Sequence, residues 1–269
     1  MKTYQTEQIR NIALLGNTGS GKTSLAESMM FEGKVIERKG TIDGKNTVSD
    51  YTEIEQQNQR SIFSTLLYTE FNNSKLNIID TPGSDDFVGA VISSMYPADL
   101  LVMVINAQYG VEVGTEIFNR HAERLHKPMV LAVNQLDHDK ANFDATLDSL
   151  KQTFGNKVIL TQYPVATGAA FDSFIDVITM KMYKFKGDTG IREEFPIPDS
   201  EMDKATELHN ALIEAAAEND ESLMEKFFEQ GSLSEDEMRS GLSKGIASRS
   251  IMPVFCLSAA KNIGTKRLM

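Results

Sequence analysis

The sequence predicts an α/β fold, in which helices cover both faces of a doubly wound, mostly parallel sheet. Two observations support this prediction. Short segments that are apolar at nearly every position recur along the chain, as expected for central strands buried on both faces. Segments with helical periodicity lie between them, such as residues 23–31 and 113–124. The strands are expected at residues 11–15, 76–79, 100–105, 129–133 and 251–257.

The composition is that of a globular protein with a substantial core. The chain has 269 residues, 41% of them apolar, and a formal net charge of −11 from 27 basic and 38 acidic residues. A single cysteine, Cys256, excludes an intramolecular disulfide framework and a cysteine-cluster metal site. The apolar runs are about six residues at most, too short to span a membrane, and the N-terminus lacks a signal-peptide core. We therefore expect a cytoplasmic protein without a membrane partner.

The negative charge is concentrated in one segment. Residues 186–245 contain 16 acidic and 6 basic residues, a net charge of −10, whereas the other 209 residues contain 22 and 21, a net charge of −1. The total disfavours a DNA-binding protein that would cover a phosphate backbone with most of its surface. The distribution instead indicates a near-neutral body and one strongly acidic segment.

A phosphate-binding loop follows the first expected strand. The motif G-x-x-x-x-G-K-[ST] is complete in Gly16-Asn17-Thr18-Gly19-Ser20-Gly21-Lys22-Thr23, with Ser24 continuing into the next helix. In this motif the backbone N–H groups and the helix N-terminus bind phosphates. Lys22 is expected to reach the β- and γ-phosphates, and the Thr23 hydroxyl to bind Mg²⁺.

A second motif follows the strand at residues 76–79. Asp80-Thr81-Pro82-Gly83 provides a carboxylate for Mg²⁺ and, at Gly83, a backbone N–H that a γ-phosphate can approach. This tetrapeptide alone is also typical of a turn. Its place after the phosphate-binding loop favours a metal-binding role for Asp80.

Two further motifs predict guanine specificity. Asn134, Gln135 and Asp137 follow the strand at 129–133, and the Asp137 carboxylate matches the two adjacent donors of guanine, which adenine lacks. Ser258, Ala259 and Ala260 follow the last strand, where backbone N–H groups would meet the guanine O6. An ATP-using enzyme with a phosphate-binding loop is therefore disfavoured.

With all four motifs in order, the chain resembles the nucleotide-binding domain of the elongation factor G family of translational GTPases. The resemblance extends to residues 55–60, 192–198, 212–227 and 253–256. It implies GTP or GDP and Mg²⁺ as ligands, the ribosome as partner, and translocation as the function of a longer factor of which this chain is a part. It also implies a GTP-binding body at residues 1–157 and 251–269 and an inserted acidic α+β subdomain at 158–250. Nothing in the sequence indicates more than a monomer.

Three positions that concern hydrolysis depart from the family pattern. Ser84 stands where the family has the histidine that orients the attacking water, Phe63 where it has a metal-binding threonine, and Gly19 where it commonly has an aspartate. We therefore expect GTP binding with slow or absent hydrolysis, and assign no catalytic residue. The alternative is an active, ribosome-stimulated GTPase with unconventional catalytic residues: Ser64 or Thr65 for the threonine, and Asp85 or Asp86 for the histidine. Gln135 replaces a lysine that packs on the base, so we expect weaker affinity there.

The inserted subdomain carries acidic residues at helical spacing. Glu207, Glu214, Glu218, Glu221 and Glu225 would form one stripe on a continuous helix, beside an apolar stripe of Ala205, Leu208, Leu212 and Ala215. Residues 234–237 read as a capping box that opens a further helix. The family resemblance implies that the insert faces the ribosomal stalk protein, so the first four glutamates are candidate partner-binding residues. The alternative is a solvated helix face without a partner.

Overall fold

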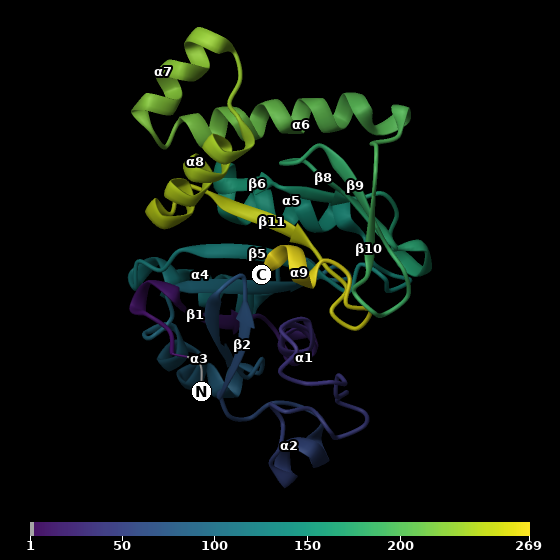
Figure 1. The fold of residues 1–269 in the computed structure, drawn as a ribbon. Helices are drawn as coiled ribbons and strands as arrows, with labels where there is room; N and C mark the ends of the chain where they lie inside the picture. The colour runs from purple at the N-terminus through teal and green to yellow at the C-terminus, as the bar shows by residue number, and fades with distance from the viewer. Residues whose placement is uncertain (1–2) are drawn as a thin grey trace.

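The expected strands lie side by side in one seven-stranded sheet of the computed structural model, which describes residues 3–269 (Figure 1). The strands are β1 (Ile9–Leu15), β2 (Thr65–Phe71), β3 (Ser74–Asp80), β4 (Leu100–Asn106), β5 (Met129–Asn134), β6 (Val158–Leu160) and β11 (Met252–Cys256). Their order is β2-β3-β1-β4-β5-β11-β6, and every neighbouring pair is parallel except the hairpin of β2 and β3. The predicted α/β class and mostly parallel sheet are confirmed.

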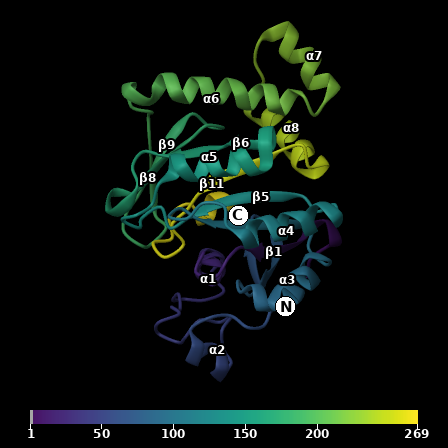
Figure 2. The ribbon, with the colours of Figure 1, turned by 180° about the vertical axis from the view of Figure 1, so that it is seen from behind.

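Helices cover both faces of this sheet (Figures 1 and 2). Successive residues of a strand point to opposite faces. Leu14 of β1 accordingly belongs to the buried cluster that contains Met29, whereas Leu15 belongs to the other cluster, which contains Phe118. The helices of this part are α1 (Lys22–Glu32), α2 (Glu53–Asn58), α3 (Val88–Met95), α4 (Val113–Arg124), α5 (Phe143–Phe154) and α9 (Thr265–Leu268). Short 3₁₀ turns lie at Thr6–Gln8, Asp85–Phe87, Gly155–Lys157 and Gly168–Ala170.

The carboxyl end of β1 lies at the topological switch point of the sheet. β1 has β3 as one neighbour and β4 as the other, so the connection after β1 turns to one side and the connection after β3 crosses to the other. Open α/β sheets bind ligands at this point. The phosphate-binding motif follows β1 directly and is therefore placed at the expected ligand site.

A second, smaller sheet and three helices form the acidic part of the chain. The sheet is antiparallel, with the order β10-β9-β8-β7, and contains β7 (Gln162–Pro164), β8 (Ser173–Asp176), β9 (Lys181–Phe185) and β10 (Arg192–Phe195). The helices are α6 (Asp199–Ala217), α7 (Glu221–Gln230) and α8 (Glu235–Ser248). α6 and α8 pack closely because Gly241 has no side chain; a Cβ atom there would lie 2.3 Å from the carbonyl oxygen of Ala216.

This acidic part is joined to the body by continuous packing. Residues 158–160, which begin the proposed insert, form the edge strand of the large sheet and pair with β11. Arg267 of α9 donates from Nε to Asp176 of β8 at 2.6 Å, and the Asp176 side chain is buried. Val133 of β5 and Phe174 of β8 belong to one cluster of buried residues. The two parts therefore share a hydrophobic core.

The acidic stripe does not run along one helix, so this expectation is wrong. α6 ends at Ala217, and Glu218 is its C-cap. The Asp220 side chain then accepts a hydrogen bond from the Ser222 N–H at 3.0 Å and starts α7, as an N-cap aspartate does. Glu207 and Glu214 thus lie on α6, whereas Glu221 and Glu225 lie on α7. The capping box at residues 234–237 is confirmed at the start of α8.

The expected apolar stripe of α6 packs into the core. Ala205, Leu212 and Ala215 are buried, and Leu208 packs against the same core. Cys256 is fully buried in β11, and burial raises the pKa of its thiol well above the usual range. None of the helices within residues 3–269 combines the length and apolar character needed to cross a membrane.

Candidate nucleotide-binding site

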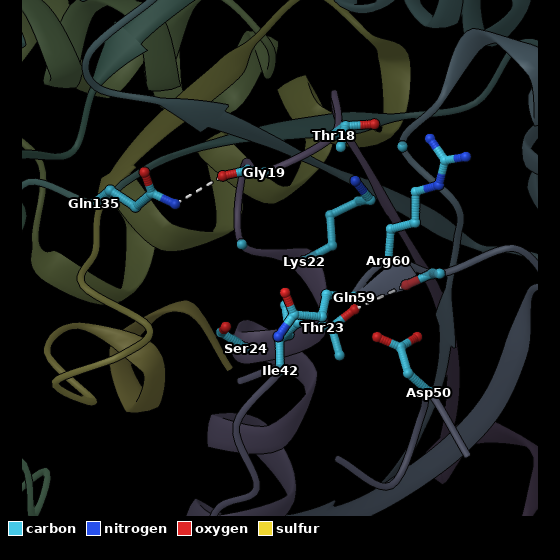
Figure 3. Close-up of a pocket in the computed structure, with 13 residues that line it drawn as sticks. Thr18, Gly19, Lys22, Thr23, Ser24, Ile42, Asp50, Gln59, Arg60 and Gln135 are labelled. Atoms are coloured by element: carbon cyan, nitrogen blue, oxygen red, sulfur yellow. Dashed lines mark hydrogen bonds between the residues drawn. The ribbon is translucent and has the colours of Figure 1, made fainter. Parts of the chain in front are cut away.

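The loop between β1 and α1 lines a cavity of about 200 Å³ (Figure 3). α1 begins at Lys22, and no side chain caps its first turn, which leaves backbone N–H groups of this turn for an anionic ligand. Gly21 has φ +91°, and a Cβ atom there would lie 2.3 Å from Nδ2 of Asn134. Glycine is therefore required at this position of the motif. From the motif and its continuation, the cavity is lined by Thr18, Gly19, Gly21, Lys22, Thr23 and Ser24.

Lys22 is held against the loop that precedes it. Its Nζ donates to the carbonyl oxygens of Gly16 at 2.7 Å and Asn17 at 2.9 Å, and only 6% of the residue is exposed. Burial lowers the pKa of Lys22 to about 8, although Asp80 and Asp50 act in the opposite direction. The side chain remains protonated at neutral pH. A polyanion in the cavity would stabilise this charge.

Thr23 and Asp80 meet as the sequence predicts. The Thr23 hydroxyl donates to Asp80 Oδ2 at 2.8 Å, and its oxygen lies 3.2 Å from Ser61 Oγ. Asp80 is fully buried, and burial raises its pKa to about 6, opposed by the nearby hydroxyls of Ser49 and Thr23. Asp80 Oδ1 accepts no hydrogen bond from any residue in 3–269. Hydroxyl and carboxylate oxygens around an unsatisfied acceptor fit Mg²⁺, which prefers oxygen ligands.

Gly83 lies against the phosphate-binding loop. A Cβ atom at this position would be 2.6 Å from both Lys22 Nζ and the Thr18 nitrogen, so only glycine fits. The following residue, Ser84, donates its hydroxyl to Asp86 Oδ2 at 3.2 Å and does not line the cavity. Asp85 and Asp86 are exposed. The chain thus brings Gly83, but not Ser84, to the cavity.

The guanine motifs are tied to the phosphate-binding loop by amide side chains. Asn134 donates to the Ser20 carbonyl oxygen at 2.8 Å and accepts from the Ala259 N–H at 2.9 Å. Gln135 has φ +61° and donates to the Gly19 carbonyl oxygen at 2.7 Å. Gln135 lines the cavity, whereas Asn134, Asp137, Ser258, Ala259 and Ala260 lie outside its lining.

The residues expected to recognise the base, which lie outside the lining of the cavity, have partners of their own. Asp137 Oδ2 lies 3.9 Å from Nζ of Lys261. The Ala260 carbonyl oxygen accepts a hydrogen bond from Lys39 Nζ at 2.7 Å. Ser258 pairs its backbone with Ile263, which closes the loop after β11 into a tight turn. The loop therefore has a defined shape before any base is bound.

The segment of residues 33–64, which precedes β2, is organised by two buried glutamates. Glu27 of α1 accepts from the N–H groups of Gly40 at 2.7 Å and Val48 at 2.5 Å. Glu55 of α2 accepts through Oε1 from the N–H groups of Ile62 at 3.0 Å and Phe63 at 3.1 Å. These bonds position residues of the segment at the cavity: Ile42, Asp50, Gln59, Arg60 and Ser61.

Ser64 and Thr65, the alternatives to the family's metal-binding threonine, have other partners in this structure. Ser64 Oγ lies 2.9 Å from Ser94 Oγ, and Thr65 donates to the Ser49 carbonyl oxygen at 3.1 Å. Neither contacts Thr23. The Phe63 side chain is 55% exposed and carries no group that could bind a metal. The hydroxyl beside Thr23 belongs to Ser61, which was not singled out, and neither was Asp50. A capping box at residues 52–55 was the available sequence signal that this segment is structured.

The candidate partner-binding residues lie far from this cavity, on the helices at the opposite end of the molecule (Figure 1). Glu207, Glu214, Glu218 and Glu221 are all exposed. None of the four forms an ion pair with another residue of the described chain. Their carboxylates therefore face solvent.

Comparisons with known proteins identify relatives of this chain. The model of a family described as the elongation factor Tu GTP binding domain matches residues 7–269. Elongation factor G of Mycoplasma genitalium is 33% identical over 269 residues, which are 100% of this chain and 39% of the relative. A crystal structure of a Thermus thermophilus protein superimposes with a TM-score of 0.90 at 29% identity, covering 97% of this chain and 39% of that one.

The chain thus spans about two fifths of the length of both relatives. The resemblance to elongation factor G seen in the sequence motifs is confirmed by the relative and by the family match. With the phosphate-binding loop, the Thr23–Asp80 pair and the Asn134 bridge in their places, this chain belongs to the family of elongation factor Tu GTP-binding domains.

Proposed function

We propose that this chain binds GTP and GDP together with Mg²⁺, as the nucleotide-binding domain of an elongation factor G-like ribosomal translocation factor. The observation that carries the proposal is the bridge made by Asn134, which joins the phosphate-binding loop at Ser20 to the loop at Ala259. Lys22 and Gly83 would hold the phosphates. Thr23 and Asp80 would hold Mg²⁺, and Asp137 would select guanine. When bound, the metal would neutralise phosphate charge.

We further propose that hydrolysis is slow or absent. The Ser84 hydroxyl donates a hydrogen bond to Asp86, and Ser84 does not line the cavity. The side chain of Phe63 has no oxygen that could bind a metal, and Gly19 has no carboxylate. Positioned groups in phosphoryl transfer contribute roughly 10²–10⁵ in rate. Loss of several such groups leaves the binding residues intact. Nucleotide occupancy would then drive the action of the factor.

The second candidate is an active, ribosome-stimulated GTPase with unconventional residues. One observation favours it: Arg60 lines the cavity, and its guanidinium lies on the Thr18 side of it (Figure 3). An arginine there would stabilise charge that develops on the phosphates. The two candidates differ in the hydrolysis rate and share the same nucleotide site.

One experiment separates these candidates. GTP and GDP affinities and single-turnover GTP hydrolysis would be measured with ribosomes, for the natural factor and for Ser84→His. We expect micromolar or tighter binding, slow hydrolysis, and a gain on the order of tenfold or more for Ser84→His, because imidazole can act as a general base. Ser84→Asn, with a side chain that does not titrate, serves as the control. Rapid hydrolysis by the natural sequence would establish the second candidate instead.

The acidic part of the chain is proposed to contact the ribosomal stalk protein through Glu207, Glu214, Glu218 and Glu221. Their exposure and the absence of ion pairs among the described residues support this proposal. We also propose that the chain acts as a cytoplasmic monomer, with neither DNA nor membrane as partner. The near-neutral charge of the body is compatible with work at the ribosome.

A further inference from the structure

Hydroxyl and carboxylate oxygens converge beside the phosphate-binding loop. Thr23 Oγ1 lies 2.8 Å from Asp80 Oδ2 and 3.2 Å from Ser61 Oγ. Asp50 lines the same cavity, and its carboxylate points toward Thr23 (Figure 3). Thr23 and Asp80 come from α1 and β3, whereas Asp50 and Ser61 come from the segment before β2. The second pair is not part of any motif described above.

The spacing of these oxygens matches an octahedral magnesium ion. Mg²⁺ binds oxygen ligands at about 2.0–2.1 Å in near-ideal octahedral geometry, which places adjacent ligands about 3.0 Å apart. The separations of Thr23 Oγ1 from Asp80 Oδ2 and Ser61 Oγ lie on either side of this value. One cation would therefore contact Thr23 and Ser61 with little rearrangement of either side chain.

The burial of Asp50 gives a separate indication of a cation site. Asp50 is 5% exposed, and neither of its carboxylate oxygens has a hydrogen-bond partner among the residues described, although the nearby Ser61 hydroxyl acts to lower its pKa. Asp80 Oδ1 nearby is equally unsatisfied. Lys22 acts on both carboxylates, which sets one positive charge against two negative ones. Burial of a carboxylate whose charge is not balanced costs free energy. A divalent cation would balance the charges of Asp50 and Asp80.

The other two hydroxyls of residues 59–65 contact groups other than Thr23. Ser64 contacts Ser94, and Thr65 donates to Ser49. Ser61 is fixed by its neighbours, because Glu55 accepts from the backbone N–H groups of Ile62 and Phe63. The fold thus directs the Ser61 hydroxyl, and no other from residues 59–65, to Thr23.

We propose that Ser61 is a direct ligand of the divalent cation that accompanies the nucleotide, next to Thr23, in a site completed by the carboxylates of Asp50 and Asp80. This inference rests on the proposed binding of a guanine nucleotide. It assigns the metal ligand of the segment to a serine two positions before Phe63. The nucleotide-bound cation is thereby held by α1, β3 and the segment before β2 together.

The test measures how Mg²⁺ controls nucleotide release. The dissociation rate of a fluorescent GDP analogue would be followed as MgCl₂ is titrated, for the unmodified chain, Ser61→Ala, Ser61→Thr and Asp50→Asn. We expect Ser61→Ala and Asp50→Asn to need about tenfold more Mg²⁺ for half-maximal slowing, since loss of a group that holds a metal commonly costs 10–100-fold in affinity. Ser61→Thr keeps the hydroxyl and should remain within about twofold. GDP affinity in EDTA should stay unchanged in Ser61→Ala, which separates a metal ligand from a structural residue.

Ser64→Ala is the matched control, because it removes a hydroxyl three positions away that faces Ser94. If Ser61→Ala shows the same Mg²⁺ dependence as Ser64→Ala while the unmodified chain responds to Mg²⁺, the inference is overturned and the proposed function stands. If Ser61→Ala weakens GDP binding equally in EDTA, Ser61 is structural and the inference also fails. An unmodified chain that binds no guanine nucleotide would overturn the proposed function and the inference with it.

Discussion

The buried carboxylate of Asp80 lowers the stability of the folded chain at neutral pH. Burial raises its pKa to about 6 from a usual value of 3.8, although the Ser49 and Thr23 hydroxyls and Lys22 favour its charged form. Asp50, the other buried carboxylate that acts on it, adds to the rise. The folded chain therefore binds more protons than the unfolded chain between about pH 4 and 6. Stability conferred by this residue falls as the pH rises through that window.

Replacement of this carboxylate should stabilise the metal-free chain. In EDTA at pH 7, Asp80→Asn is expected to raise the free energy of unfolding by on the order of 1–3 kcal/mol, with a smaller gain at pH 4.5, where Asp80 of the folded chain is protonated. Urea unfolding at both pH values measures this. Asp86→Asn, at an exposed position of the following turn, should leave stability unchanged. A gain of equal size at both pH values would show that the charge of Asp80 is not its cause.

At the scale of the elements, helix α2 fixes the path of the segment before β2. Glu55 accepts hydrogen bonds from Thr52, Ile62 and Phe63. Burial by itself raises the pKa of Glu55, but these hydrogen bonds outweigh it and lower the pKa. A single side chain therefore sets the path of residues 59–63. The position of Ser61 depends on it.

Removal of Glu55 should loosen this segment locally. We expect Glu55→Ala to leave the N–H groups of residues 62 and 63 without this acceptor, at about 0.5–1.5 kcal/mol for each bond, and to speed amide hydrogen exchange there. Glu53→Ala, which removes an exposed carboxylate bonded to Gln57 on the same helix, is the control. Exchange that accelerates equally in both variants, or in neither, would contradict the role assigned to Glu55.

The elements differ in how far the sequence could predict them. The five expected strands lie within β1, β3, β4, β5 and β11. Each contains an apolar run because helices cover both faces of the sheet, so their burial is visible in composition, whereas β2, with Thr and Glu among its residues, shows no such run. β10 is short and largely exposed, and its residues include no apolar run that would predict a strand. The break between α6 and α7 was missed because the acidic periodicity continues through Glu218 and Glu221, while the stop comes from one capping residue, Asp220.

The candidate site divides in the same way. Lys22, Thr23, Asp80 and Gly83 lie in short motifs, where spacing along the chain fixes geometry in space. Asp50 and Ser61 reach the cavity only because Glu27 and Glu55 fold a long irregular segment against α1 and the sheet. The sequence shows their chemistry but not their place. Tertiary hydrogen bonds, rather than local pattern, bring them to Thr23.

At the scale of the whole molecule, the charge is separated from the nucleotide site. The net charge of −10 lies in residues 186–245 and that of −1 in the remainder. The exposed glutamates of α6 and α7 occupy the end of the molecule opposite α2 (Figure 1). Their field would raise the association rate with a basic partner more than the final affinity.

A charge reversal tests this surface. Glu214→Lys combined with Glu218→Lys should slow binding to ribosomes, with a larger effect at low salt than at high salt because exposed charges are screened. Stopped-flow association measured at two salt concentrations gives the comparison. Asp144→Lys combined with Asp148→Lys makes the same change of charge on α5 and should have little effect. Equal association rates for the two double variants would mean that the acidic face of α6 is solvated and contacts no partner.

Asn134 connects three parts of the chain that are distant in sequence, because one amide bonds both Ser20 and Ala259. The span between the place for the phosphates and the place for the base is therefore set by the length of one side chain. Asn134 thereby fixes the separation of the two loops. A nucleotide whose base and phosphates are spaced differently would match one end of the site and miss the other.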